Sequence, residues 1–251
     1  MYFAPKILAV KKIGVIVPYR GDRPRFFENL KRMLNAQTLQ PTIIEFVDFP
    51  PAGENKDITV RYREGYERLR GKGLDVIALM EVDDWYAPDY LEVMYNEWEK
   101  EGRPDIFGQT YTIYYHIKEF GYFTMHHIEP ARSSAMNTFI KPDLNLTWPP
   151  DFDPYTDVHL WKFADINQHQ FIAPAHRLRG VVFTPKKHIC LGIKHGVGLC
   201  GGGSHIHGLE RYTYTRNGVE DKEKKFLRET MDAVSFEFYS NYFAAEVANN
   251  S

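Results

Sequence analysis

The chain has few cysteines: only Cys190 and Cys200 occur among its 251 residues. Small secreted domains are usually cross-linked by several disulfides, so this scarcity excludes a disulfide framework and favours a reducing, cytoplasmic setting. The sequence also lacks a long apolar run, and we therefore expect no membrane span. Residues 1–12 (MYFAPKILAVKK) do not show the charged, apolar and small-residue regions of a secretory signal.

An excess of charge of either sign is missing as well. Lysine and arginine number 31, aspartate and glutamate 33, and the formal net charge is −2. A protein with this balance has no global basic surface, so a nucleic-acid partner would have to be held by a local basic patch. The length is sufficient for one α/β domain with a full hydrophobic core.

Strands and helices are expected to alternate through the first part of the chain. Three short apolar runs, at residues 13–18, 42–47 and 76–80, read as buried strands. Apolar residues recur at helical spacing after Pro24, over residues 57–70 and over residues 88–101. This order is typical of a parallel sheet with helices on its faces.

The second part of the chain has a different pattern. Residues 106–117 are rich in β-formers, and residues 122–128 are expected to pair with them. Residues 141–155 contain four prolines and should form an ordered loop. Residues 219–247 carry an apolar stripe that predicts a closing helix, made of Leu227, Met231, Val234, Phe238 and Tyr242.

Three acidic residues follow the buried run at 76–80. Glu81, Asp83 and Asp84 should lie at the carboxyl end of that strand, where open α/β sheets bind their ligands. Hard oxygen ligands in an E-x-D arrangement suit Mg²⁺ or Mn²⁺ bound to a polyphosphate. The alternative is a solvated loop whose acids cap the next helix, but Pro88 and Asp89 already supply a helix start.

Together, these motifs resemble the family-2 glycosyltransferases of the GT-A fold. The resemblance covers about residues 13–115. It is carried by the segments IGVIVPYR (13–20), AQT (36–38), the strand ending at Asp48, and EVDDWY (81–86) followed by PDYL (88–91).

The resemblance implies an α/β fold with a Rossmann-like, mostly parallel central sheet flanked by helices, a smaller β-containing acceptor part and a C-terminal helix. We expect a single catalytic domain over residues 1–251. Its nucleotide-sugar half would extend to about residue 105, its acceptor half would span about 106–210, and its helical segment about 211–251.

The same resemblance implies a donor site at the ends of the first strands. Residues lining the base pocket would be Pro18, Tyr19 and Arg20, and Asp48 would accept a hydrogen bond from the base. An arginine near the base and phosphates would be Arg61 or Arg63, although the family's usual R-N-x-G reads Tyr62-Arg63-Glu64-Gly65 here.

In the acidic motif, Asp83 would coordinate the metal. Glu81 replaces the usual first aspartate, and its longer side chain would reach the donor ribose or a metal-bound water.

Catalysis by an inverting member needs a base for the acceptor hydroxyl. Asp157 is the candidate implied by the resemblance, because it follows a proline-rich loop and opens a helix. Helix capping is the alternative role, and Asp151, Asp153 and Asp165 are rival bases. Aromatic side chains that would stack on the acceptor are Trp148, Tyr155 and Trp161, unless they belong to the core.

Histidines lie in the glycine-rich stretch at residues 195–208. His195 or His205 would complete the metal shell, as in some GT-A enzymes, and Lys194 would pair with a donor phosphate. The competing hypothesis is a zinc site, which lacks any C-x-x-C pair and would use Cys190, His195, Cys200, His205 and His207.

The sequence thus predicts a Mn²⁺- or Mg²⁺-dependent, hexosyltransferase-like enzyme that moves a sugar from a nucleotide sugar, UDP-linked, to an acceptor hydroxyl with inversion. The acceptor would be a glycan or, in a phage-type enzyme of the host cytoplasm, a hydroxymethylated base in DNA. An enzyme that flips such a base out of the duplex needs a basic groove to hold the DNA. The candidate residues for this groove are Arg177, Arg179, Lys186, Lys187 and Lys194. Two other classes remain as alternatives, a nucleotidyltransferase and a non-catalytic nucleotide-sugar-binding module.

Overall fold

A computed structural model describes residues 10–50, 57–126, 132–162, 164–166, 178–196 and 218–244. Its larger sheet has seven strands in the order β2-β1-β3-β8-β5-β10-β9. All neighbours in this sheet are parallel except β8, which runs antiparallel to β3 and β5. The strands are β1 (Ile13–Pro18), β2 (Ile43–Val47), β3 (Val76–Leu79), β5 (Ile106–Gln109), β8 (Thr138–Ile140), β9 (Ala164–Ile166) and β10 (Leu178–Phe183).

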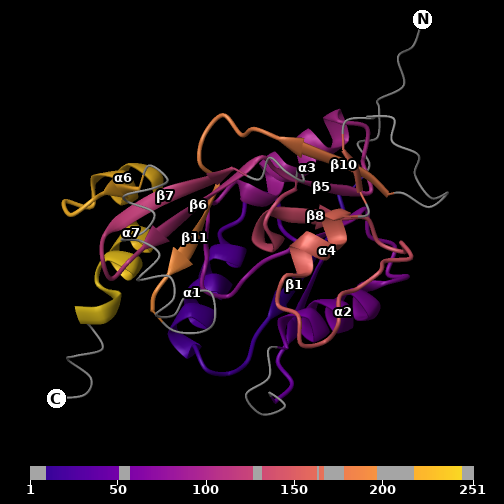
Figure 1. The fold of residues 1–251 in the computed structure, drawn as a ribbon, viewed down its shortest axis with the longest axis horizontal. Helices are drawn as coiled ribbons and strands as arrows, with labels where there is room; N and C mark the ends of the chain where they lie inside the picture. The colour runs from indigo at the N-terminus through magenta and orange to yellow at the C-terminus, as the bar shows by residue number, and fades with distance from the viewer. Residues whose placement is uncertain are drawn as a thin grey trace, which may run out of the picture.

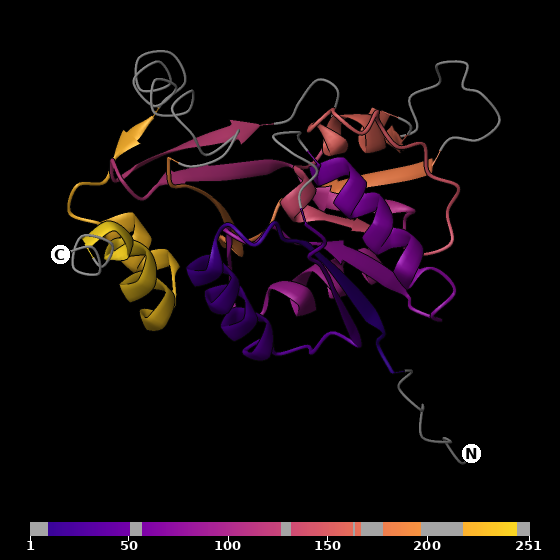
Figure 2. The same cartoon turned by 90° about the horizontal axis from the view of Figure 1, so that it is seen from below.

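Helices cover both faces of this sheet (Figures 1 and 2). The helices α1 (Pro24–Asn35) and α3 (Tyr90–Lys100) bury their apolar stripes in one core cluster, and α2 (Ile58–Leu69) and α4 (Thr156–Lys162) contribute to the other. Every residue of β1 and β3 is buried, as expected for strands between two helical layers. The predicted α/β architecture, a mostly parallel sheet flanked by helices, is confirmed and is consistent with a GT-A fold.

A second sheet of five strands stands beside the first, in the order β12-β7-β6-β11-β4. The expected hairpin is present as β6 (Tyr111–His116) and β7 (Gly121–His126). In Figure 1 it reaches toward the C-terminal helices α6 (Lys225–Thr230) and α7 (Ala233–Ser240). The other strands are β4 (Trp85–Tyr86), β11 (Cys190–Lys194) and β12 (Val219–Glu220).

Residues 106–140 differ from the sequence expectation in two ways. The β-rich stretch 106–117 is not one strand, because β5 belongs to the large sheet and β6 to the small one, with Thr110 between them. Strand β8 was missed, since its three residues are too short to show a period. It follows a 3₁₀ turn, η1 (Ala135–Asn137).

The prediction of one closing helix over 219–247 was wrong. Its start pairs with β7 as the edge strand β12. The helix is interrupted at Asp232, whose backbone is extended. The side chain of Asp232 accepts a hydrogen bond from the amide of Ser235 and so caps a new helix, α7. Val234, assigned to the apolar stripe, is 57% exposed. Within the described residues, no helix is long and apolar enough to cross a membrane.

Candidate functional site

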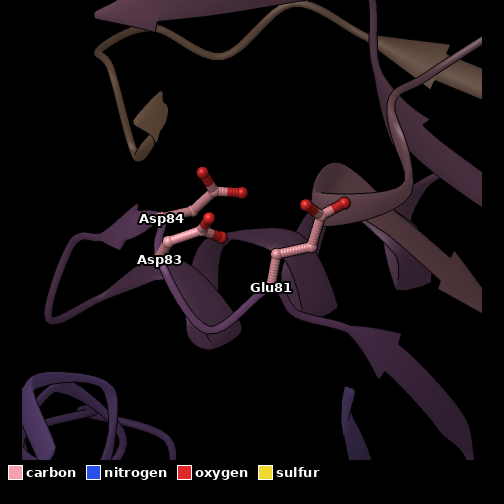
Figure 3. A group of neighbouring side chains, drawn as sticks. All are labelled: Glu81, Asp83 and Asp84. Carbon is pink, nitrogen blue, oxygen red and sulfur yellow. The ribbon is translucent and has the colours of Figure 1, made fainter. Parts of the chain in front are cut away.

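The three acids after β3 form one cluster. Ligand oxygens of Glu81, Asp83 and Asp84 all lie within 4.8 Å of one another. Figure 3 shows their carboxyl groups on the same side of the loop that carries them. Strand β3 ends at Leu79 and the buried run at Met80, and the chain then turns at the carboxyl end of a parallel strand, the position where such sheets bind ligands.

Asp83 is held by two basic side chains. Arg23 donates from Nη1 to Asp83 Oδ2 over 2.5 Å, and His195 Nε2 lies 2.8 Å from the same oxygen. Burial alone would raise the pKa of Asp83, but the charge of Arg23 and the hydrogen bond from His195 outweigh it and hold this pKa well below its usual range. Asp83 is therefore an ionised carboxylate at neutral pH, as a metal ligand must be.

The other two acids are shifted the opposite way. Burial, followed by the charge of Asp83, raises the pKa of Glu81 to about 7. Burial next to Glu81 and Asp83 also raises the pKa of Asp84 well above its ordinary value. Ionising all three neighbouring carboxyls costs free energy. Positive charge bound at this point would therefore stabilise their ionised forms.

Asp84 also anchors the acidic turn to distant parts of the chain. Its Oδ1 accepts a hydrogen bond of 2.8 Å from the amide of Ile193 in β11. Its main-chain carbonyl accepts a bond of 2.9 Å from the hydroxyl of Tyr239 in α7. The residue is 2% exposed. These contacts fix the turn that carries the acidic residues.

Lys194 supplies a further cation beside the cluster. It ends β11, is 9% exposed, and its Nζ lies 4.5 Å from the centre of the Tyr114 ring. Burial lowers the pKa of Lys194, but the neighbouring Tyr114, Asp84 and Glu81 outweigh it, and the pKa is raised overall. A buried ammonium group in this position suits the recognition of a phosphate.

The residues present fit a divalent cation. They offer carboxylate oxygens from one short segment, which is the donor set that Mg²⁺ and Mn²⁺ prefer. Beside them, the hydroxyl of Tyr62 is fully buried and interacts with Glu81. Burial raises the pKa of Tyr62 well above its ordinary value, and the charges of Glu81, Asp84 and Asp83 add to that shift.

The expected base pocket lies at the ends of β1 and β2, whose last residues, Pro18 and Val47, are paired in register. Pro18 is buried, whereas Tyr19 and Arg20 are partly exposed. Tyr19 stacks on Phe27, with ring centres 4.1 Å apart. Asp48 follows β2 and is exposed.

Of the two candidate arginines, Arg61 has no exposed surface. Its guanidinium donates to the carbonyls of Tyr19, Val47 and Phe49 and to the carboxylate of Asp57. Arg61 therefore ties the ends of β1 and β2 together and does not reach a ligand in this conformation, which corrects its assignment as a direct donor contact. Arg63 is partly exposed and pairs with Asp151.

Asp157 begins α4 and forms an ion pair with Arg132 through Oδ2. Burial lowers the pKa of Arg132, and the neighbouring Tyr114 opposes that shift. The ammonium of Lys194 lies over the ring of Tyr114, and the hydroxyl of Tyr114 contacts Ser134. Tyr114 therefore lies between the acidic cluster and the Arg132–Asp157 pair.

The aromatic residues expected at the acceptor fall into three environments. Trp161 is 1% exposed and donates from its indole to Thr138, so it is a core residue and its assignment to acceptor binding was wrong. Trp148 is half-buried against Tyr66. Tyr155 is 57% exposed on the loop before α4.

The zinc hypothesis and the second histidine fall largely outside the described residues, which omit Cys200, His205 and His207. Cys190 is described, and it is buried between Gln109 and Asn137. Burial holds the pKa of its thiol far above the usual range. Among the described residues, the acidic triplet is the cluster with the spacing for a metal ion.

Sequence reasoning missed Arg23. This residue lies just before α1, where a charged residue is ordinary, and its partner is 60 positions away. Its role became visible only when the fold placed it beside a carboxylate.

The chain was compared with known proteins. The family model for glycosyl transferase family 2 matches residues 52–156, a stretch that contains the acidic cluster and ends one residue before Asp157. No curated protein matches the chain. The strand β1 and the expected base-pocket residues 18–20 precede the matched stretch.

Proposed function

Residues 52–156 of this chain carry a glycosyl transferase family 2 sequence, and from that premise we propose that the protein transfers a sugar from a nucleotide sugar, UDP-linked, to an acceptor hydroxyl. The single observation that carries the proposal is the acidic cluster at the end of β3, closed in by Arg23, Lys194 and His195. The reaction would proceed with inversion and require Mn²⁺ or Mg²⁺.

The donor would lie across the ends of β1, β2 and β3. In this proposal Tyr19 and Arg20 face the base, and Asp48 accepts a hydrogen bond from it. Glu81 reaches the ribose or a metal-bound water, and Asp83, with His195 beside it, holds the cation. When bound, the metal acts as a Lewis acid that stabilises the charge on the leaving diphosphate.

The chain's own cations add to that stabilisation. Lys194 is buried, positively charged and within interaction distance of Asp83 and Glu81. A fixed ammonium in a water-poor site stabilises developing negative charge more strongly than water does, because it needs no reorganisation. Lys194 is therefore assigned to the departing diphosphate.

Asp157 is assigned as the base that accepts the acceptor's hydroxyl proton. Arg132 holds its Oδ2 and so fixes the orientation of the carboxylate. The partly exposed ring of Tyr155 lies two residues earlier in the chain and offers an apolar face to a sugar. A saccharide acceptor suits this combination of a carboxylate and an aromatic ring.

Hydroxymethylated DNA remains an alternative acceptor. Two of its expected basic residues are engaged elsewhere, since Arg179 donates to the carbonyls of Glu101 and Gly102, and Lys187 pairs with Asp89. Arg177 lies outside the described residues. A saccharide is therefore the acceptor that we place first.

The proposal is tested with a panel of UDP- and GDP-sugars, each with Mn²⁺, Mg²⁺ or EDTA, and with simple saccharides or hydroxymethylated DNA as acceptors. We expect metal-dependent release of the nucleotide, and we expect Asp83→Asn to remove it. The matched control, Glu97→Gln, neutralises a carboxylate on the outer side of α3 and should be as active as the wild type. Failure of every donor to bind or turn over would overturn the proposal.

A further inference from the structure

Asp83 Oδ2 has two basic partners. Arg23 Nη1 lies 2.5 Å from it and His195 Nε2 lies 2.8 Å from it. Both pairs are shielded, since the side chain of Arg23 is 20% exposed, that of Asp83 13% and that of His195 1%. A guanidinium so close to a carboxylate neutralises it and occupies the oxygen that a cation would use.

Arg23 lies just before α1, and Pro24 starts the helix. Its Nη1 binds Asp83, whereas its buried Nε makes no hydrogen bond among the described residues and lies 3.8 Å from Asp22 Oδ1. An unsatisfied buried N–H destabilises the protein, and an anion placed beside Arg23 would relieve that cost.

A divalent cation alone therefore meets an Asp83 carboxylate that is already paired with a guanidinium. Arg23 and Lys194 are two cations facing the cluster, and both would repel Mn²⁺. A diphosphate that binds together with the cation brings negative charge. Its oxygens can accept hydrogen bonds from Arg23, and Asp83 is then available to the metal.

Resting on the proposed function, we propose that Arg23 is a positioning residue that takes the place of the metal at Asp83 in the donor-free protein. It passes from Asp83 to the donor diphosphate when metal and nucleotide bind together. The consequence is strong coupling, in which Mn²⁺ binds weakly alone and tightly with the nucleotide.

The first experiment measures binding of Mn²⁺ alone by electron paramagnetic resonance to wild type, Arg23→Gln and Arg25→Gln. Arg25 is the matched control, because it lies two residues away, loses the same charge and contacts Tyr242 instead of the cluster. We expect Arg23→Gln to bind Mn²⁺ at least tenfold more tightly than wild type, and Arg25→Gln to match wild type. A merely structural role for Arg23 would leave affinity equal or reduced.

Arg23→Met is measured in parallel, in case Arg23→Gln does not fold, and circular dichroism establishes folding of each variant. The proposal is overturned if the folded Arg23 variant binds Mn²⁺ no more tightly than wild type. A second arm repeats the titration with saturating UDP or GDP, which should tighten Mn²⁺ binding at least tenfold in wild type and much less in Arg23→Gln. If neither nucleotide binds, the proposed function fails, while the metal-only comparison still decides the role of Arg23.

Discussion

At the residue scale, the site depends on side chains whose charges are fixed by their neighbours. Asp83 stays ionised because Arg23 and His195 outweigh the effect of burial. Glu81, two residues away, has the opposite shift. Two carboxylic acids thus acquire different chemistry within one short turn, and the difference arises from contacts made by remote segments.

The clearest test at this scale concerns Asp157. Asp157→Asn keeps the size of the side chain but removes its basicity, so we expect kcat to fall by about 10²–10⁴-fold, the usual contribution of a general base. Donor affinity should stay the same, because the proposed role of Asp157 is on the acceptor side. Steady-state kinetics and nucleotide titration measure the two quantities separately.

The controls are Asp151→Asn and Asp153→Asn, which alter rival carboxylates on the same loop. Asp151 pairs with Arg63, and Asp153 with His159. Both variants should retain near-normal kcat. If either of them loses activity while Asp157→Asn keeps it, the base has been misassigned.

The residue scale also shows where sequence patterns stop being informative. The acids at 81, 83 and 84 were recognisable because they end an apolar strand, which is a local signal. Trp161 was misjudged because an aromatic residue looks the same in sequence whether it faces a ligand or the core. Arg23 was invisible as a site residue, since its meaning comes from a partner 60 positions away.

At the element scale, α2 packs very closely on the sheet at Gly65. A Cβ at this position would lie 2.5 Å from Ile16 Cγ2 and 3.0 Å from Val47 Cγ2. Alanine has the higher helix propensity, so an isolated helix would gain stability from Gly65→Ala. In the folded protein the clash with Ile16 and Val47 outweighs this gain. We therefore expect Gly65→Ala to lower the free energy of unfolding by about 1–3 kcal/mol.

Urea denaturation measures this loss. Glu67→Ala, on the exposed side of α2, is the control and should change the free energy of unfolding by less than about 0.5 kcal/mol. A stabilised Gly65→Ala variant would mean that α2 lies further from β1 than the structure shows.

The cap of α7 gives a second prediction at this scale. Asp232 accepts from the amide and hydroxyl of Ser235 and pairs with Arg32. Burial would raise the pKa of Asp232, but these contacts outweigh it and lower the pKa. Asp232→Ala should therefore cost about 0.5–2 kcal/mol at pH 7, the range for a lost N-cap.

The sign of the pH dependence follows from the lowered pKa. A carboxyl whose pKa is depressed in the folded protein stabilises it above the unfolded value of about 3.9, and loses that effect as the pH falls through the folded value. The difference in Tm between wild type and Asp232→Ala should thus be largest near pH 7. It should decrease as the pH falls below about 4. Asp232→Asn retains a good cap and should lose less stability at pH 7.

Elements were easier to predict from the sequence in the first part of the chain than in the second. Residues 13–80 alternate between strands and amphipathic helices, and each of these shows either an apolar run or a helical period in the sequence. The later strands are short and change sheets, as at Thr110, where the chain leaves the large sheet for the small one. A change of sheet depends on tertiary contacts and has no periodicity of its own.

At the scale of the whole molecule, the proposed donor site joins the ends of strands in the large sheet to β11 and α7. A ligand that binds the native protein only must stabilise all of these parts together. Saturation at one hundred times Kd adds about 2.7 kcal/mol to the free energy of unfolding. UDP with Mn²⁺ should therefore raise Tm, and EDTA should reverse the shift.

Thermal melts of wild type and Asp83→Asn test this expectation. The variant should show little stabilisation by the same ligands, while Glu97→Gln should respond like wild type. An equal rise of Tm in Asp83→Asn would place the nucleotide away from the acidic cluster.

The anchoring of Asp84 has a consequence for synthesis. The hydroxyl of Tyr239 bonds to the carbonyl of Asp84 across 155 positions of the chain, and Ile193 bonds to its side chain across 109. A ribosome translates the strands of the large sheet's first half long before either partner exists. The acidic turn therefore reaches its final geometry only after α7 has been made, and a nascent chain cannot assemble this site before α7 emerges.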